Sequence, residues 1–264
     1  SVFPGLTPMN PATALAFILA GASMLLQLNE SDGMRNHLGQ ICALVAAFVG
    51  LSRLLGYLFP WFFRVDQWLF YEKLAGNAMA PNTAFNFVLV GFSLMFLDIK
   101  NKFFRLMAQF TTILANLITL VALIGYAYSV KGLYDLSASS PMALNTALAF
   151  NFLCVAIFCL RPDRGFMGIL TSDAIGGVVV RRLFPAAIII PPILGELSLL
   201  GQRAGWVDTE VGFSMIVVAV MVISIGFIFS VSDAIAKIDI ARKKAEEALR
   251  ESRDYLDKII NSVA

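Results

Sequence analysis

Long apolar stretches alternate with short polar connections along this chain, and the alternation predicts membrane-spanning helices. A helix needs about 20 apolar residues to cross the hydrocarbon core, because every backbone polar group must be satisfied inside the segment. Seven stretches fit this requirement, at residues 11–28, 39–59, 81–97, 103–130, 142–160, 183–200 and 211–231. The expected fold class is therefore an all-α integral membrane protein with seven transmembrane helices.

The composition agrees with a chain that lies in a lipid bilayer. Of its 264 residues, 58% are hydrophobic and 14% are charged, whereas ordinary soluble domains carry about 25% charged residues. The net charge is only +2. No polar segment combines a basic face with interleaved aromatic residues, so nucleic acid is not an expected partner.

An internal repeat organises the predicted spans. Three spans begin alike, with MNPATALAF at 9–17, MAPNTAFNF at 79–87 and MALNTALAF at 142–150. The helices that return across the membrane also match one another, with LLGY at 54–57, LIGY at 123–126 and ILGE at 193–196. Such a repeat marks one supersecondary unit used several times. We therefore expect three repeated helix hairpins and a seventh, unpaired helix.

The shared start of the repeats has two interpretations. Proline in a first turn, with Asn or Thr to cap free amides, is typical of helix initiation. The same polar residues are also expected to line an outward-facing pocket for a ligand or signal, and the two tyrosines of the returning helices are either part of it or interfacial anchors. These candidates are Thr13, Tyr57, Asn82, Thr83, Tyr126, Asn145 and Thr146.

Two ionisable side chains, Arg53 and Glu196, fall inside predicted spans. Charged groups are costly in hydrocarbon, so each is a candidate functional residue by default. Both lie at comparable depth in the repeat, toward the predicted outer side. They either form an intramembrane ion pair or extend separately to the outer interface on their long side chains.

The connections between the spans predict the orientation of the chain. One set is rich in basic residues, and such loops face the cytoplasm. The alternate set contains more acidic than basic residues, and its longest member, residues 60–80, is aromatic enough to anchor at the outer surface or to cover a ligand. The N-terminus is then expected on the periplasmic side and the C-terminus in the cytoplasm. The basic loops contain Arg35, Lys100, Lys102, Arg105, Arg161, Arg164, Arg181 and Arg182.

The C-terminal tail has a heptad pattern. Spacings of three and four residues without a break, between charged neighbours, predict a parallel two-stranded coiled coil that continues the seventh span and makes the protein a homodimer. A solvated linker helix is the alternative, since Arg242 and Ser252 also occupy the seam. Its apolar and small positions are Ile235, Ile238, Ala245, Leu249, Leu256, Ile259 and Val263.

The sequence contains no recognisable catalytic pattern. It has neither a glycine loop followed by Lys nor an HExxH pattern, and His37 is its single histidine. Cys42, Cys154 and Cys159 fall inside predicted spans without CxxC spacing. We therefore expect no enzyme activity in this segment, no metal and no cofactor.

Several short segments resemble a known class of receptor. Residues 241–252, ARKKAEEALRES, resemble the linker before PAS domains in bacterial sensor histidine kinases and diguanylate cyclases, and residues 255–264, YLDKIINSVA, resemble the first helix of a PAS domain. The multi-pass input region of those receptors is similar to segments at 79–84, 161–165, 176–182 and 201–205. Glu196 departs from the apolar or aromatic residue that the resemblance would place there.

The resemblance implies a domain order and a function. Residues 1–231 would be a seven-helix transmembrane sensor module, 232–254 a coiled-coil signalling helix, and 255–264 the start of a truncated PAS domain. The stimulus would pass through the seventh helix to PAS and output domains of the same chain, in a protein-histidine kinase or, as a second choice, a diguanylate cyclase. A small-molecule transporter or channel is the alternative, although transport requires no heptad tail and the repeats share one orientation.

Overall fold

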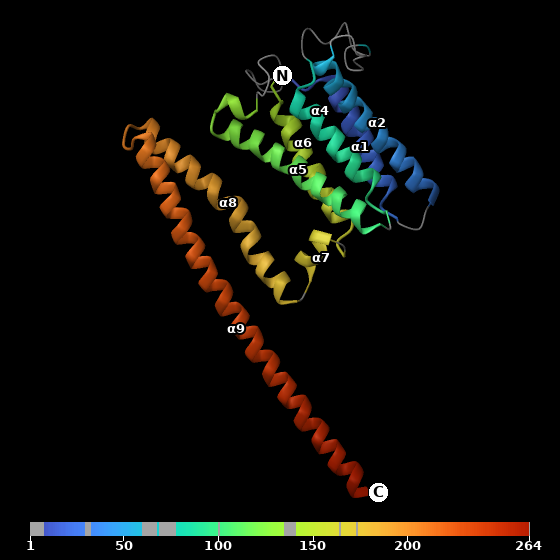
Figure 1. Cartoon of the computed structure of the whole chain (residues 1–264), viewed down its shortest axis with the longest axis vertical. Helices are drawn as coiled ribbons and strands as arrows, with labels where there is room; N and C mark the ends of the chain where they lie inside the picture. The colour runs from blue at the N-terminus through green and yellow to red at the C-terminus, as the bar shows by residue number, and fades with distance from the viewer. Residues whose placement is uncertain are drawn as a thin grey trace. The chain divides into compact units, whose positions relative to one another are not determined.

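The computed structural model describes the chain except for residues 1–7, 30–32, 60–67, 69–77, 100, 135–140, 164, 173 and 264. It is all-α (Figure 1) and divides into two compact units, Ser1–Gly168 and Ile169–Ala264. Most of the aromatic loop at 60–80 lies outside the described residues. The elements are α1 (Pro11–Leu26), α2 (Gly33–Leu58), α4 (Pro81–Met95), α5 (Lys102–Ala127), η1 (Lys131–Leu133), α6 (Leu144–Leu160), α7 (Gly165–Thr171), α8 (Ile175–Arg203) and α9 (Thr209–Val263).

Four helices of the described chain are long and apolar enough to cross a membrane. They are α2, α5, α8 and the Thr209–Ser232 part of α9, and α6 with α7 would make a fifth if the bent pair is one span. A helix also occupies each of the other predicted stretches, but α1 and α4 have only 16 and 15 residues. Their length, about 24 Å or less, is below that of the hydrocarbon core. The described residues thus contain four to five candidate spans, as in a multi-pass membrane protein.

Two helices begin earlier than the apolar pattern predicted. The spans were expected to start at residues 39 and 183, whereas α2 and α8 start at Gly33 and Ile175. The added segments, residues 33–38 of α2 and 175–182 of α8, contain exposed basic side chains, including Arg35 and Arg181. A backbone helix does not need to end where its apolar stretch ends, because polar side chains can project into water from the same helix.

Unit 1 is built around three parallel inner helices, α1, α4 and α6 (Figure 1). Phe17, Phe87 and Phe150 occupy equivalent positions of the repeat, and their ring centroids lie 5.0, 4.5 and 4.7 Å apart in the buried core. Tilted and edge-on rings at this spacing attract one another in addition to burying apolar area. The repeat therefore brings its three starts together in one aromatic cluster.

The outer helices of unit 1 pack between neighbouring inner ones. Helix α2 contacts α1 and α4, and α5 contacts α4 and α6. The contacts of α1 with α2 and of α4 with α5 are those that the first two predicted hairpins require, and the hairpin arrangement itself stays a prediction. The third predicted hairpin would combine α6 with α8, which belong to different units, and it stays a prediction.

Helices α2 and α4 approach each other closely at two glycines. A Cβ atom on Gly50 would lie 2.4 Å from the carbonyl oxygen of Ala84, and one on Gly91 would lie 2.5 Å from the Cβ of Ala47. Small residues let membrane helices approach until their backbones are in contact. Two glycines that face the opposite helix therefore set the distance between α2 and α4.

Asparagine side chains form hydrogen bonds at the starts of the inner helices. Asn10 is the N-cap of α1, and its side chain accepts a hydrogen bond of 2.8 Å from the amide of Ala12. In α4 and α6, Asn82 and Asn145 lie inside the first turn and each accepts a 3.0 Å hydrogen bond from the following threonine amide. These contacts support the helix-initiation interpretation of the shared start.

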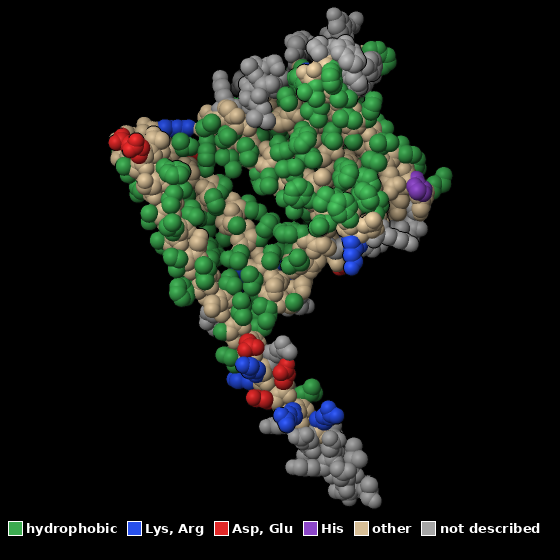
Figure 2. Space-filling model, in the orientation of Figure 1, with side chains coloured by type: hydrophobic (Ala, Val, Ile, Leu, Met, Phe, Trp, Pro, Cys, Tyr) green, Lys and Arg blue, Asp and Glu red, His purple; other side chains and the backbone are tan. Residues whose placement is uncertain are grey.

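Unit 2 consists of α8 packed against α9. The turn between them follows the ordinary glycine closure of a helix: Gly205 has φ +72° and the amide of Trp206 donates to the carbonyl of Gly201 over 3.0 Å. Helix α9 then runs for 55 residues without a break, through the predicted seventh span and the tail. Figure 2 shows charged side chains at this turn and on the distal part of α9, with apolar side chains between.

Candidate functional site

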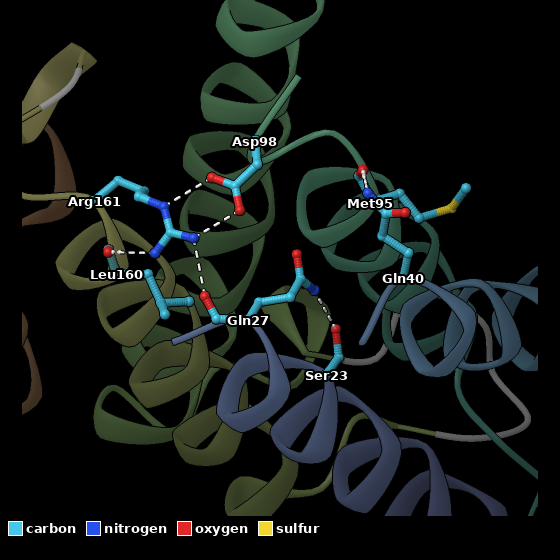
Figure 3. Close-up of polar contacts among 7 residues, drawn as sticks. All are labelled: Ser23, Gln27, Gln40, Met95, Asp98, Leu160 and Arg161. Atoms are coloured by element: carbon cyan, nitrogen blue, oxygen red, sulfur yellow. Dashed lines mark hydrogen bonds and ion pairs between the residues drawn. The ribbon is translucent and has the colours of Figure 1, made fainter. Parts of the chain in front are cut away.

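A buried arginine joins the C-terminal ends of the three inner helices (Figure 3). The Nε of Arg161 donates to Oδ1 of Asp98 over 2.8 Å, and its Nη2 donates to Oδ2 over 2.6 Å. The same Nη2 donates to the carbonyl of Gln27 over 2.9 Å, and Nη1 donates to the carbonyl of Leu160 over 2.8 Å. The two charged side chains are 9% and 22% exposed. We call Arg161, Asp98 and the Gln27 carbonyl the inner-helix clamp.

The clamp occupies a position where helices need hydrogen-bond donors. The last carbonyls of a helix have no intrahelical partner and carry partial negative charge. Gln27 caps α1, Leu160 is the last residue of α6, and Asp98 follows the end of α4. One guanidinium therefore satisfies two helix ends and pairs with the carboxylate that follows the third.

The surroundings of the clamp are also hydrogen-bonded. The side-chain amide of Gln27 donates to Oγ of Ser23 over 2.8 Å, and Gln40 of α2 donates to the carbonyl of Met95 over 3.5 Å (Figure 3). From the sequence, Arg161 was interpreted as a loop charge that sets orientation and as part of the segment 161–165 that carries the family resemblance, and not as a buried residue. The sequence did contain a signal for this pair. Arg161 and Asp98 are 63 residues apart, as are the starts of the second and third repeats, so the two residues occupy equivalent positions of the repeat.

The opposite ends of the hairpins are tied by tyrosine hydroxyls. Tyr57 donates to the carbonyl of Met79 over 2.7 Å, and Tyr126 donates to the carbonyl of Met142 over 2.5 Å. Both tyrosines end a returning helix, and both methionines open the next repeat. The two predicted site residues thus hold the start of the following inner helix, a structural contact that sequence reasoning did not foresee.

Arg53 is 5% exposed and lies beside the first of these tyrosines. Its Nη2 donates to the hydroxyl of Tyr57 over 3.0 Å and its Nε donates to the carbonyl of Met79 over 3.3 Å. The guanidinium carbon is 4.3 Å from the centroid of the Tyr57 ring, within the range of a cation–π contact. Glu196 belongs to the other unit, so the predicted ion pair stays a prediction.

The three repeat threonines lie one turn before the aromatic cluster. Thr13, Thr83 and Thr146 are all buried, on three adjacent inner helices. The associated amides differ in surroundings, because Asn82 is buried whereas Asn145 is exposed. The shared pocket that these residues were expected to line stays a prediction.

A ladder of polar side chains connects α4, α5 and α6. Two pairs join α4 to α5: Asn86 donates to Thr119 over 3.1 Å, and Ser93 shares a hydrogen bond with Thr112. A third pair joins α6 to α5, where Asn151 donates to Asn116 over 3.0 Å. Polar pairs of this kind hold helices together in an apolar environment. Sequence reasoning missed the ladder, although its α5 members follow a helical spacing.

The described residues offer little for metal or thiol chemistry. No group of three or more His, Cys, Asp or Glu side chains in the described part of the chain could hold a metal ion. Cys42, Cys154 and Cys159 are free thiols. The polar clusters described above fasten helix to helix through hydrogen bonds and through the ion pair of Arg161 with Asp98.

Comparison with protein-family models, curated proteins and solved structures finds no match for this chain. The fold itself defines the class, a multi-helix protein with several candidate membrane spans.

Proposed function

We propose that this chain is the transmembrane input module of a bacterial signal-transduction receptor, most consistent with a sensor histidine kinase. In this proposal a stimulus in or outside the membrane alters the helix bundle. The change passes along α9 to PAS and output domains on the cytoplasmic side. The observation that carries the proposal is the unbroken course of α9 from an apolar span into a charged, heptad-patterned tail.

The length of α9 suits transmission across a membrane. At about 1.5 Å per residue, a 55-residue helix extends for about 82 Å. The Thr209–Ser232 part, with 24 residues, covers about 36 Å, which is enough for the hydrocarbon core. The rest of α9 extends beyond the membrane. Because the helix is continuous, a displacement at one end would move the other end as well.

The tail has the surface of a helix that lacks its partner. Leu249, a seam residue, is 72% exposed, and the neighbouring Lys243 and Asp239 form an exposed i,i+4 ion pair at 3.3 Å. An exposed apolar seam residue between charged neighbours favours association with a second identical helix. The homodimer through the signalling helix is therefore part of the proposal.

The finer architecture also belongs to the proposal. Seven spans arranged as three hairpins and a seventh helix would form the sensor module at 1–231. The signalling helix at 232–254 and the PAS start at 255–264 would follow it. The repeated contacts of Tyr57 with Met79 and of Tyr126 with Met142 support a repeated hairpin unit. The chain would lie in the inner membrane with its C-terminus in the cytoplasm.

Cysteine labelling should report this orientation. A cysteine at His37, exposed on α2, should be protected from a membrane-impermeant maleimide in intact cells, because the basic loops face the cytoplasm. A cysteine at Asp208, exposed before α9, should be labelled. Both variants need a background without Cys42, Cys154 and Cys159. Permeabilised cells, in which both positions should react, provide the control. Labelling of His37→Cys but not of Asp208→Cys in intact cells would show that the orientation is the opposite of the predicted one.

Insertions into α9 test the signalling function itself. Residues 1–254 would be joined in register to the output domains of a histidine kinase, and autophosphorylation measured in membranes. Seven residues inserted between Ala248 and Leu249 preserve the heptad phase and should leave autophosphorylation within about twofold, whereas two residues rotate the seam by about 200° and should change it by about tenfold or more. Equal autophosphorylation of the two insertions would contradict a signalling helix.

A further inference from the structure

An open apolar groove of about 620 Å³ lies between α8 and α9 within unit 2. Its α8 wall includes Leu183, Ala187 and Ile190, and its α9 wall includes Ile228 and Ile235. Ile228 is 67% exposed although it lines the groove, so the two helices do not fill the space between them. The groove lies along the membrane-spanning part of α9 and reaches the first residue of the tail seam.

The groove and the tail seam occupy one face of α9. Ser224, Ile228, Val231 and Ile235 all line the groove, and their spacing of four, three and four residues is that of a heptad seam. The seam of the tail begins at Ile235 and continues through Ile238 with the same rhythm. Positions with this spacing lie along one slowly turning stripe of a helix. The stripe therefore runs from the membrane to Ile238, at the start of the tail.

We propose that the α9 helix of a second copy of this chain occupies the groove. The inference deepens the proposed function, on which it rests, since it assumes the parallel dimer of the tail. Paired helices lie about 8 to 10 Å apart. Because α9 is unbroken at Ile235, two α9 helices that pair in the tail remain close one and two turns earlier, at Val231 and Ile228.

The shape of the groove fits a symmetric pair of copies. A two-fold axis presents the same patch from both subunits, so each α9 would lie in the groove of the other. The α8 wall contains Ala186 and Ala187, and small side chains allow close helix approach in membranes. The helices α8 and α9 of both copies would then form a four-helix interface, and the stripe would be covered along its full length.

Disulfide crosslinking in native membranes tests the proposal. In a chain in which Cys42, Cys154 and Cys159 are replaced, single cysteines are placed at Ile228 and, as a matched control, at Phe229. Phe229 is 71% exposed and lies about 100° around the helix from Ile228. After oxidation, Ile228→Cys should give at least about fivefold more crosslinked dimer than Phe229→Cys, because only the seam position faces its counterpart.

Cysteines in the tail separate failure of this inference from failure of the proposed dimer. Leu249→Cys lies in the seam and Glu247→Cys lies beside it. Crosslinking at Leu249 with none at Ile228 would overturn occupation of the groove by a second copy, and would assign the groove to lipid or to the same chain. Crosslinking at neither position would overturn the tail dimer as well. Equal crosslinking at Ile228 and Phe229 would also overturn the proposal that α9 of a second copy occupies the groove.

Discussion

Replacing Arg161 with methionine should lower the free energy of unfolding by about 3–5 kcal/mol, the usual cost of breaking a buried ion pair from one side. The variant leaves the Asp98 carboxylate without its bidentate partner, and it removes the donor to the carbonyls of Gln27 and Leu160. Because these groups end three different inner helices, the loss should loosen the core at one end. Thermal unfolding of the purified protein in detergent measures the effect.

Two comparisons show whether the ion pair itself is responsible. The double variant Arg161→Met with Asp98→Leu leaves no unpaired charge, so its cost should be smaller than the sum of the two single costs. Arg105 is half-buried and makes no side-chain hydrogen bond or ion pair within the described part of the chain. Arg105→Met should therefore cost less than about 1 kcal/mol. If the loss of unfolding free energy in the double variant equalled the sum of the two single losses, the ion pair would not stabilise the protein.

Much of the helical organisation could be predicted from the sequence, because hydrophobic stretches and repeats are local patterns. The repeat at 9–17, 79–87 and 142–150 placed three equivalent phenylalanines on three helices, and they meet in the core of unit 1. The heptad spacing predicted that the tail continues the last span as one helix, which α9 confirms. Helices α1 and α4 end two residues before the predicted spans, since Gln27 and Phe96 cap them.

The polar contacts were harder to predict because backbone atoms take part in them. The hydroxyls of Tyr57 and Tyr126 donate to main-chain carbonyls, which no side-chain pattern reveals. Arg53 likewise donates to a main-chain carbonyl, that of Met79, which its charge and its depth in the repeat did not predict. Arg161 was treated as one loop charge among several, since its burial depends on how three helix ends meet.

The second large effect is expected at Gly50, where α2 and α4 approach each other closely. Gly50→Ala should destabilise the protein by about 1–3 kcal/mol, the usual cost of overpacking, because the new methyl group would lie 2.4 Å from the carbonyl oxygen of Ala84 and 2.9 Å from Cβ of Phe87. A backbone carbonyl cannot turn aside as the end of a long side chain can, so the helices would have to separate. Gly50→Leu should lower the free energy of unfolding by more than Gly50→Ala does.

Gly21 provides the matched control for Gly50. It lies inside α1, and a Cβ atom there would meet nothing within 4 Å. With no clash, alanine should only restrict the unfolded chain and favour the helix, a gain of about 0.5–1 kcal/mol. Thermal unfolding in detergent should therefore shift in opposite directions for Gly21→Ala and Gly50→Ala. If both variants gained stability, α2 and α4 could not lie as close as their facing glycines place them.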